Sequence, residues 1–562
     1  MLRVLKEQGE APQWLTEDGY KTLCGGYMLA EETPRAMYRR VAKAAASYLK
    51  DSLRWECKFF DIMWRNWLCP ASPVLSNMGT ERGLPVSCNL IHCDDSVNDI
   101  FTKVHELAML SKNGAGVGVY LGDVRGRGAP IKGNGVSEGV IPWAKVFDAT
   151  TVAVSQGSSR RGASALYLPV EHLDAAEFIN IRRPVGDINR RCLNINNGLC
   201  ISDRWMESML AGDHEKQELW REILNARVST GEPYLFFTDT VNEANPEVYK
   251  DKGLSVKSSN LCTEIMLHTD KDTTFVCCLS SMNLTKWDEW ADTDAVETAV
   301  RFLDCVLEEY IRKIKDLEGF GNAYRGASEG RPVGLGVLGW HTLLQMKGIA
   351  FDSFDAMTLN NKVFKVMRQK ADFGTQQLAK ELGEPPMLVG YGRRNSHTLA
   401  VAPTVSNSLI SGGHSAGIEP LSDNYFMQPS AKGTFVRKNP QLVAVLSELG
   451  QDTPEVWKSI LKAKGSVQHL DFLDQQTKEV FKTAREINQM AIVNQAAQRQ
   501  KYIDQGQSVN LFFAGNDDPQ YVHDVHVAAW SQGLKSLYYL RSEGVLQGDV
   551  ASRDTSCKAC EG

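Results

Sequence analysis

Residues 260–264 read Asn-Leu-Cys-Thr-Glu, and residues 275–284 follow as Phe-Val-Cys-Cys-Leu-Ser-Ser-Met-Asn-Leu. In an extended segment, side chains at alternate positions point to the same side. The amide of Asn260, the thiol of Cys262 and the carboxylate of Glu264 would then form one compact group suited to acid–base and thiol chemistry. Taken alone, the pentapeptide also fits a buried cysteine in a strand flanked by surface polar residues, and the second stretch fits an apolar core strand.

The C-terminus carries a further pair of thiols, Cys557 and Cys560, in a CxxC motif. Such a motif can bind zinc or cycle between dithiol and disulfide. Zinc needs four ligands, and no second CxxC or histidine pair accompanies this one, so redox work is the favoured interpretation. The last residues are polar and lack periodicity, which predicts a flexible tail. A dithiol on a flexible tether can carry electrons between a buried site and an external reductant.

The composition is that of an ordinary globular protein. Of the 562 residues, 43% are hydrophobic and 23% are charged, which excludes the disordered and fibrous classes. The net charge is -6 and no long block of like charge occurs, so a nucleic-acid polymer is not an expected partner. The sequence shows no membrane-spanning run and no signal peptide. We therefore expect a cytoplasmic protein without membrane contact, in the host cytoplasm if the source is viral.

Three regions follow from the apolar pattern. Residues 1–68 are expected to be a small helical region, because residues 33–49 carry helical apolar spacing behind a Thr-Pro start. Residues 69–541 mix helical stretches with strand-like runs broken by Gly, Asn and Pro, which favours one large α/β body. Residues 542–562 form the tail. The helical stretches of the α/β body are residues 202–210, 219–226, 295–314 and 359–382, with a long helix near 475–503.

Taken in chain order, the motifs closely resemble those of the catalytic subunit of ribonucleotide reductase. Asn-x-Cys-x-Glu is followed by Cys-x-Leu-Ser-Ser-x-Asn-Leu, and a CxxC tail ends the chain. Each motif is weak by itself, whereas their joint order is very specific. The other matching stretches are Glu-Thr-Pro at 32–34, Arg-Val-Ala at 40–42, Ser-Pro-Val-Leu-Ser-Asn-Met-Gly-Thr at 72–80, Ser-Cys-Asn-Leu at 87–90 and Pro-Thr-Val-Ser-Asn-Ser at 403–408.

The resemblance implies an α/β barrel of ten strands, built from two parallel five-stranded halves, with Cys262 at the tip of a central finger loop. In the family, a thiyl radical at this cysteine removes the 3′ hydrogen of a ribonucleotide. By the same resemblance, Glu264 is the general base on the 3′ hydroxyl and Asn260 hydrogen-bonds the sugar. Cys88 and Cys277 would protonate the departing 2′ hydroxyl and supply two electrons, closing to a disulfide.

The resemblance also implies how substrate phosphates are bound and how the dithiol is restored. A disulfide inside a barrel cannot meet a protein reductant, so Cys557 and Cys560 would reduce it by exchange and be recharged by thioredoxin or glutaredoxin. The loop at 403–407 offers hydroxyls and amides for a diphosphate, although alone it also fits an ordinary helix cap. The residues implied in substrate binding are Ser72, Ser87, Gly116, Asn260, Glu264, Pro403, Thr404, Val405, Ser406 and Asn407.

The resemblance places the Gly-rich run at 114–118 beside the active site, where glycine allows close backbone approach. This run lacks the GxGxxG spacing and a suitably framed acidic residue, so we reject a Rossmann interpretation. Asp95 and Arg125 align with residues that bind the effector, for which the family uses ATP, dATP, dTTP and dGTP. No ATP-cone domain is expected before residue 32, so dATP should steer substrate choice without silencing the enzyme. The loop expected to relay that choice contributes Ser155, Gln156, Arg160 and Arg161.

The radical source is indicated by an adjacent tyrosine pair, Tyr538 and Tyr539. Two tyrosines in a row are usually ordinary β-strand residues. In this family, shortly before a CxxC tail, they match the radical-transfer residues of class I enzymes. Tyr539 would take the radical from a small subunit that holds a dimetal centre, and Tyr538 would pass it to Cys262. The resemblance implies ribonucleoside diphosphate substrates, a homodimer, and no metal or covalently bound cofactor in this chain.

Two alternatives remain at this point. An adenosylcobalamin-dependent class II reductase shares the cysteines and the tail without needing the tyrosine pair, and the Arg-Arg-Gly at 160–162 would suit it. A catalytically silent nucleotide-binding regulator of the same fold is disfavoured because every catalytic motif residue is retained. Cys278, which stands where the family pattern varies, is interpreted as structural.

Overall fold

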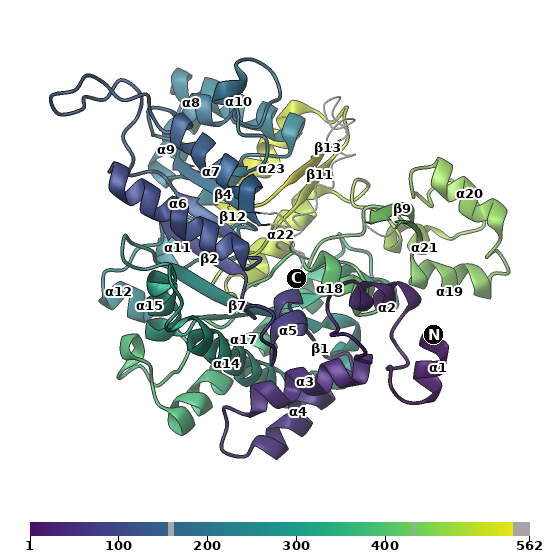
Figure 1. Cartoon of the computed structure of the whole chain (residues 1–562). Coiled ribbons are helices and arrows are strands. Elements are labelled where there is room, and N and C mark those ends of the chain that lie inside the picture. The colour runs from purple at the N-terminus through teal and green to yellow at the C-terminus, as the bar shows by residue number, and fades with distance from the viewer. Residues whose placement is uncertain (155–161, 431–432, 543–562) are drawn as a thin grey trace.

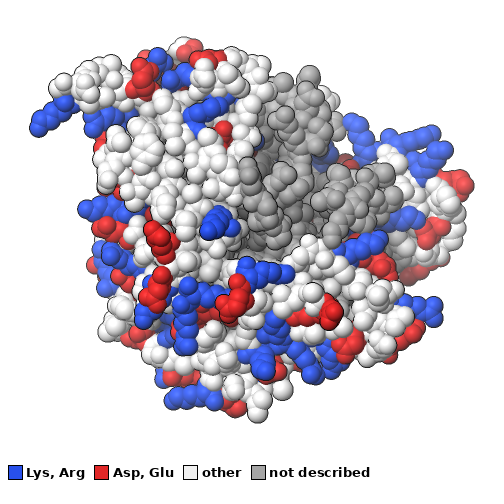
Figure 2. Space-filling view, in the orientation of Figure 1, with Lys and Arg blue, Asp and Glu red and all other residues white. Residues whose placement is uncertain are grey.

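The computed structural model describes residues 1–154, 162–430 and 433–542. Figure 1 shows an α/β body with the N-terminal helices below it and a separate helical group to its right. Within the described ranges, no helix is both long enough and apolar enough to cross a membrane. Basic and acidic side chains are interspersed over the face shown in Figure 2, as the near balance of charges in the sequence predicts.

The N-terminal region is helical, as the sequence predicts. Thr33 caps helix α3 (Pro34–Ala46), because its Oγ1 accepts a hydrogen bond of 3.2 Å from the backbone N–H of Ala36. The proline at the first helical position costs nothing there, since that N–H has no partner in a helix. Helices α3 and α4 (Ser52–Trp64) pack on each other and on α14 (Ala295–Ile314) of the barrel wall.

The first half of the barrel contains five parallel strands in sequence order. Parallel neighbours need a crossover, and helices such as α6 (Val97–Lys112) and α7 (Ile141–Val154) supply it. The strands are almost wholly buried, as expected for a parallel sheet covered by helices. They are β2 (Cys88–His92), β3 (Gly116–Tyr120), β4 (Ala163–Pro169), β5 (Asn196–Ile201) and β6 (Tyr234–Phe237).

The second half is also parallel but less regular. Strand β7 (Phe275–Asn283) pairs with β8 (Val333–Leu338). Beyond β8, two isolated parallel bridges extend the sheet. One pairs Leu335 of β8 with Leu399, and the other pairs Val401 with Gln507. The last two segments are residues 507–513 and 536–542, which pair in parallel through β11 (Leu511–Phe513) and β13 (Leu540–Ser542).

Two antiparallel seams close the ring. Strand β2 pairs antiparallel with β7, and β12 (Ser536–Leu537) pairs antiparallel with β6. In the described residues, ten extended segments therefore form a barrel of two five-stranded parallel halves. This confirms the fold class expected from the sequence.

A finger loop enters the barrel after α12 (Glu247–Asp251) and ends at β7. Two glycines leave room for its tip. A Cβ atom on Gly118 of β3 would lie 2.2 Å from the carbonyl oxygen of Ser259, and one on Gly506 would lie 3.2 Å from the backbone oxygens of Thr263 and Glu264. The loop is thus held between the two halves where only glycine permits its approach.

A second hydrophobic core lies beside the barrel and was not anticipated. It lies in three helices and the segment between them, beside the hairpin of β9 (Tyr425–Ser430) and β10 (Gly433–Lys438), at the right of Figure 1. These helices are α19 (Pro440–Glu448), α20 (Pro454–Lys462) and α21 (Gln475–Val480). The buried residues of this core are Leu442, Leu446, Trp457, Ile460, Val467, Leu470, Leu473, Val480 and Phe481.

The prediction of one long helix near residues 475–503 is wrong. The chain instead forms α21 and a separate helix α22 (Gln489–Gln500). Asn488 starts the second helix, because its side-chain oxygen accepts a 3.0 Å hydrogen bond from the N–H of Met490. Between the helices, the N–H of Ala484 bonds to the carbonyl of Leu421 instead of continuing a helical ladder.

The remaining elements complete the wall and its connections. The helices are α1 (Leu2–Glu7), α2 (Glu17–Cys24), α5 (Ser72–Asn77), α8 (Ala175–Phe178), α9 (Asp203–Leu210), α10 (His214–Thr230), α11 (Thr238–Glu243), α13 (Trp287–Trp290), α15 (Gly321–Gly330), α16 (Trp340–Met346), α17 (Phe354–Leu382), α18 (Val405–Ile410) and α23 (Pro519–Ser531). The short strand is β1 (Leu68–Pro70), and the 3-10 helices are η1 (Ile188–Arg190), η2 (Leu284–Lys286) and η3 (Pro386–Leu388).

Candidate active site

The tip of the finger loop is a turn and not the extended segment expected from the sequence. Thr263 has φ of 65°, a left-handed conformation that ends any strand-like alternation. The side-chain oxygen of Asn260 accepts hydrogen bonds from the N–H groups of Glu264 at 3.2 Å and Ile265 at 3.3 Å. The turn still groups the amide, the thiol of Cys262 and the carboxylate, because Asn260 folds back over the residues that follow it.

The turn is fully buried but keeps a polar group available. Cys262 is 0% exposed, and Glu264 and Asn260 are each 1% exposed. The Nδ2 group of Asn260 has no hydrogen-bond partner among the described residues. Buried donors are normally satisfied, so this amide is suited to a bound polar molecule. The hydroxyl of Ser508 lies 2.6 Å from the Cys262 carbonyl oxygen and 3.3 Å from Glu264 Oε2, which fixes the turn from the opposite barrel half.

Cys88 and Cys277 face each other across the β2–β7 seam as register partners. Both are buried free thiols. Burial raises the pKa of Cys277 well above that of a free thiol. A small cavity is lined by both cysteines and by Glu264, so the dithiol and the finger turn share one space. Other residues of its lining are Ala71, Pro73, Pro85, Val86, Ser87 and Leu279.

The expected phosphate loop meets the start of α5. Thr404, with φ of 54°, precedes α18, and its Oγ1 accepts a 2.7 Å hydrogen bond from the N–H of Gly417. Asn407 Nδ2 donates to the carbonyl of Pro70 at 2.9 Å, and its Oδ1 accepts from Ser72 Oγ at 3.4 Å. Pro403 precedes Thr404, and Val405 and Ser406 are the first two residues of α18. The loop therefore lies beside the residues that flank Ser72 and line the cavity.

Ser87 and Gly116 lie next to the dithiol. Gly116 pairs with Cys88 in the β2–β3 ladder, and its N–H donates to the carbonyl of Ser87 at 2.7 Å. Of the expected substrate residues, Ser87 and Glu264 line the cavity itself, and Ser72 lies between its lining residues Ala71 and Pro73.

The tyrosine pair leads to the finger turn. The hydroxyl of Tyr538 donates to Cys262 Sγ at 3.4 Å. The rings of Tyr538 and Tyr539 are 4.3 Å apart between centroids, and the ring of Tyr234 lies within 4.8 Å and 5.1 Å of them. Asn196 Nδ2 donates to the Tyr539 hydroxyl at 3.0 Å. A continuous aromatic path therefore runs from Tyr539 to the buried thiol.

Asp95 and Arg125 are paired at the carboxyl ends of β2 and β3. Arg125 Nε lies 2.7 Å from Asp95 Oδ2, and the pair is about one-third exposed. The backbone N–H of Arg125 also donates to Asp95 Oδ1 at 3.3 Å. The carboxyl ends of parallel strands are a common place for ligands in α/β folds.

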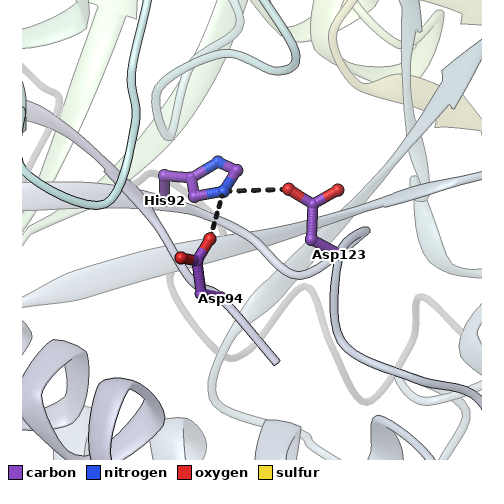
Figure 3. Close-up of side chains that lie close together, drawn as sticks. All are labelled: His92, Asp94 and Asp123. Carbon is purple, nitrogen blue, oxygen red and sulfur yellow. Dashed lines mark hydrogen bonds and ion pairs between the residues drawn. The ribbon is translucent and has the colours of Figure 1, made fainter. Parts of the chain in front are cut away.

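Beside this pair, a histidine lies between two carboxylates (Figure 3). Nε2 of His92 is 3.1 Å from Asp94 Oδ1 and 2.9 Å from Asp123 Oδ2. The hydrogen bond from His92 lowers the pKa of Asp123 to about 2. Lys257 Nζ also lies 2.7 Å from Asp123 Oδ2, so a lysine already balances the Asp123 carboxylate. We interpret the group as an ion-pair cluster that orders the strand ends.

Some sequence predictions fall outside the described residues. These are the loop residues Ser155, Gln156, Arg160 and Arg161 and the tail cysteines Cys557 and Cys560.

Sequence reasoning missed the supporting residues Asn196, Tyr234, Gln505 and Ser508. The last two belong to the polar run Asp-Gln-Gly-Gln-Ser at 504–508, which directly precedes the mainly apolar Val-Asn-Leu-Phe-Phe at 509–513. The sequence shows only that the run is polar; its burial, which is what marks these residues, is visible only in the structure.

The fold and site define a class of enzyme in which a barrel buries a finger-loop thiol close to two further thiols that face each other. Two family models match the chain. "Ribonucleotide reductase, barrel domain" matches residues 86–216, 212–387 and 387–540, and "Ribonucleotide reductase, all-alpha domain" matches residues 13–83. The chain belongs to the ribonucleotide reductase family, as its large subunit.

Relatives agree with this assignment. The chain is 40% identical over 528 residues to the "Putative ribonucleoside-diphosphate reductase large subunit" of Frog virus 3, covering 90% of this chain and 92% of that protein. It is 34% identical to the "Ribonucleoside-diphosphate reductase large subunit" of Invertebrate iridescent virus 3, covering 97% and 98%. Among solved structures, the "Actinobacillus ureae class Id ribonucleotide reductase alpha subunit" superposes with a TM-score of 0.88 at 43% identity, covering 95% and 99%.

Proposed function

We propose that the chain reduces ribonucleoside diphosphates to 2′-deoxyribonucleotides, with a thiyl radical at Cys262. The observation that carries this proposal is the 3.4 Å contact between the Tyr538 hydroxyl and Cys262 Sγ, inside a barrel whose cavity also holds Cys88 and Cys277. The names of the viral relatives support the diphosphate substrate and the production of DNA precursors.

Each buried group then has a chemical task. The Cys262 radical removes the 3′ hydrogen, while the Glu264 carboxylate accepts the 3′ hydroxyl proton and Asn260 Nδ2 hydrogen-bonds the sugar. The 2′ hydroxyl leaves as water after protonation by the dithiol. Cys88 and Cys277 supply two electrons and two protons and close to a disulfide, and the 3′ hydrogen returns from Cys262 to the sugar. The reaction therefore balances as ribonucleotide plus dithiol giving deoxyribonucleotide, water and disulfide.

The substrate diphosphate would lie on the turn before α18. Ser87 lines the cavity, Ser72 lies between its lining residues Ala71 and Pro73, and Gly116 pairs with Cys88. The residues from Pro403 to Asn407 offer hydroxyls and backbone N–H groups. This geometry would place the ribose against the finger turn.

The radical would come from a separate small subunit with a dimetal centre, entering at Tyr539 and passing through Tyr538. The aromatic contact of 4.3 Å and the likeness to a class Id alpha subunit support this route over a cobalamin enzyme. The test is turnover of CDP with a small radical subunit, compared with turnover with adenosylcobalamin. Activity only with adenosylcobalamin would overturn the class I proposal.

The tail cysteines would restore the internal dithiol. Replacing both Cys557 and Cys560 by serine should limit the enzyme to about one turnover per site with thioredoxin or glutaredoxin, because a protein reductant cannot enter the barrel. Dithiothreitol is small enough to enter and should sustain turnover. Product per site is measured with each reductant. Full thioredoxin-driven turnover in the double variant would contradict the shuttle role.

The Asp95–Arg125 pair would bind the effector nucleoside triphosphate across a homodimer, and ATP, dATP, dTTP and dGTP would select the substrate through residues 155–161. Arg125→Ala should weaken effector binding about 10- to 100-fold, because a hydrogen-bonded charge is lost. The weakened effector binding is measured as a change in substrate preference at a fixed effector concentration. Arg127→Ala, a more exposed arginine on the same loop, is the control. Equal effects of the two changes would contradict the assignment.

A further inference from the structure

Gln505 connects three parts of the barrel to the thiol of Cys277. Its Nε2 donates to Cys277 Sγ at 3.3 Å and to the carbonyl of Val333 in β8 at 3.0 Å. Its Oε1 accepts from the N–H of Met266 in the finger loop at 3.3 Å. The residue is 0% exposed, so water does not compete for these bonds.

The orientation of this amide is determined by its neighbours. The two hydrogens of an amide nitrogen match two acceptors, the sulfur and the Val333 carbonyl, and the amide oxygen matches a backbone donor. In the opposite orientation, the oxygen would face an acceptor and the nitrogen a donor. The backbone of Gln505 is held as well, since its N–H donates to the carbonyl of Leu399 at 3.1 Å.

The space around the sulfur is equally restricted. A Cβ atom on Gly334 of β8 would lie 3.1 Å from Cys277 Sγ, so the thiol sits over a glycine backbone. No side chain of β8 can therefore replace the amide as a donor at that point.

We propose that Gln505 is a positioning residue for Cys277, whose amide holds the sulfur in place and stabilises it when it carries negative charge. This inference rests on the proposed function, in which Cys277 and Cys88 lose two protons and two electrons as their S–S bond forms. An amide does not ionise, so it remains a donor at every working pH.

The other groups that face Cys277 disfavour its thiolate. Cys88 faces it from β2, Glu264 from the finger loop and Cys278 from its own strand, and each adds to the effect of burial in raising the pKa of the Cys277 thiol. Tyr249, another acidic group nearby, also interacts with it. Gln505 is the group that acts in the opposite direction.

The test is the dithiol–disulfide equilibrium of Cys88 and Cys277 in the full chain, without nucleotide or radical. The protein is equilibrated with reduced and oxidised dithiothreitol at several pH values and quenched in acid. Linked and alkylated peptides are then counted by mass spectrometry. An equilibrium does not depend on how quickly the reagent reaches a buried thiol.

Gln505→Met should shift this equilibrium toward the disulfide by about two- to tenfold, because the reduced form loses the net stabilisation of one hydrogen bond. Gln505→Glu keeps the shape but can place a charge beside the sulfur, so its shift should grow with pH as the thiolate forms. The matched control is Gln507→Met, because Gln507 is also buried but bonds to Arg499 and to the Ala496 carbonyl. It should stay within about twofold of the parent, since it makes no contact with the thiol.

Two outcomes would overturn the inference. One is an unchanged equilibrium in both Gln505 variants, and the other is an equal shift in the Gln507 control, which would indicate general loosening. Circular dichroism checks that each variant is folded. If Gln505→Met does not fold, Gln505→Glu alone provides the test. A shift in a chain that fails to reduce any nucleotide would refute the proposed function while supporting the role of Gln505.

Discussion

Cys262→Ser should abolish nucleotide reduction while leaving nucleotide binding nearly unchanged. Serine preserves the shape of a residue that is 0% exposed, and its hydroxyl can still hydrogen-bond to Tyr538. A hydroxyl does not sustain a radical as a thiol does, so the step that removes the 3′ hydrogen is lost. Product formation and effector binding are measured on the same preparation.

Cys305→Ser is the control for that experiment. Cys305 is also a buried free thiol, but it lies in α14, outside the barrel lumen. The Cys305→Ser variant should retain most of the nucleotide-reducing activity. Appreciable turnover in Cys262→Ser would remove Cys262 from the proposed mechanism, whatever the behaviour of the control.

Tyr538→Phe and Tyr539→Phe should each lower turnover by orders of magnitude, with folding and substrate affinity nearly unchanged. Phenylalanine fills the same space but lacks the O–H that must lose its proton together with the electron. For Tyr538 the change removes the hydroxyl that contacts Cys262 Sγ at 3.4 Å. For Tyr539 it removes the acceptor of the Asn196 amide. Steady-state turnover with the small subunit measures both effects.

Tyr310→Phe provides the matched control. Tyr310 is a buried tyrosine of α14 whose hydroxyl has no hydrogen-bond partner among the described residues. Loss of the Tyr310 hydroxyl should leave turnover unchanged. A cobalamin enzyme makes its radical directly beside the thiol, so near-normal rates in both tyrosine-pair variants would contradict the class I route.

Local signals in the sequence were sufficient for much of the wall of the barrel. The helix expected at residues 295–314 is α14, and the Thr-Pro start at Thr33 does cap α3. Helical spacing and caps act within one or two turns of chain, so they can be recognised without knowledge of the fold. The ordered motifs also identified the family and its barrel. The functional roles of the individual site residues remain predictions.

The same local reasoning failed where distant residues determine the backbone. The Asn-x-Cys-x-Glu motif was expected to be extended, but it is a turn because it must fit between the barrel halves at Gly118 and Gly506. The helix expected across residues 475–503 is broken because residues 442–481 form their own small core. Neither constraint is visible in a short window of sequence.

By itself, the sequence determined which side chains are available for chemistry, namely the finger-loop residues, the thiols and the tyrosine pair. Tertiary structure alone decided which of them meet. Cys262 and Tyr538 are 276 positions apart, and Cys277 and Gln505 are 228 apart. Such contacts arise when two parallel half-barrels join at antiparallel seams and enclose the finger loop. They depend on closure of the whole barrel, which local propensity and spacing do not encode.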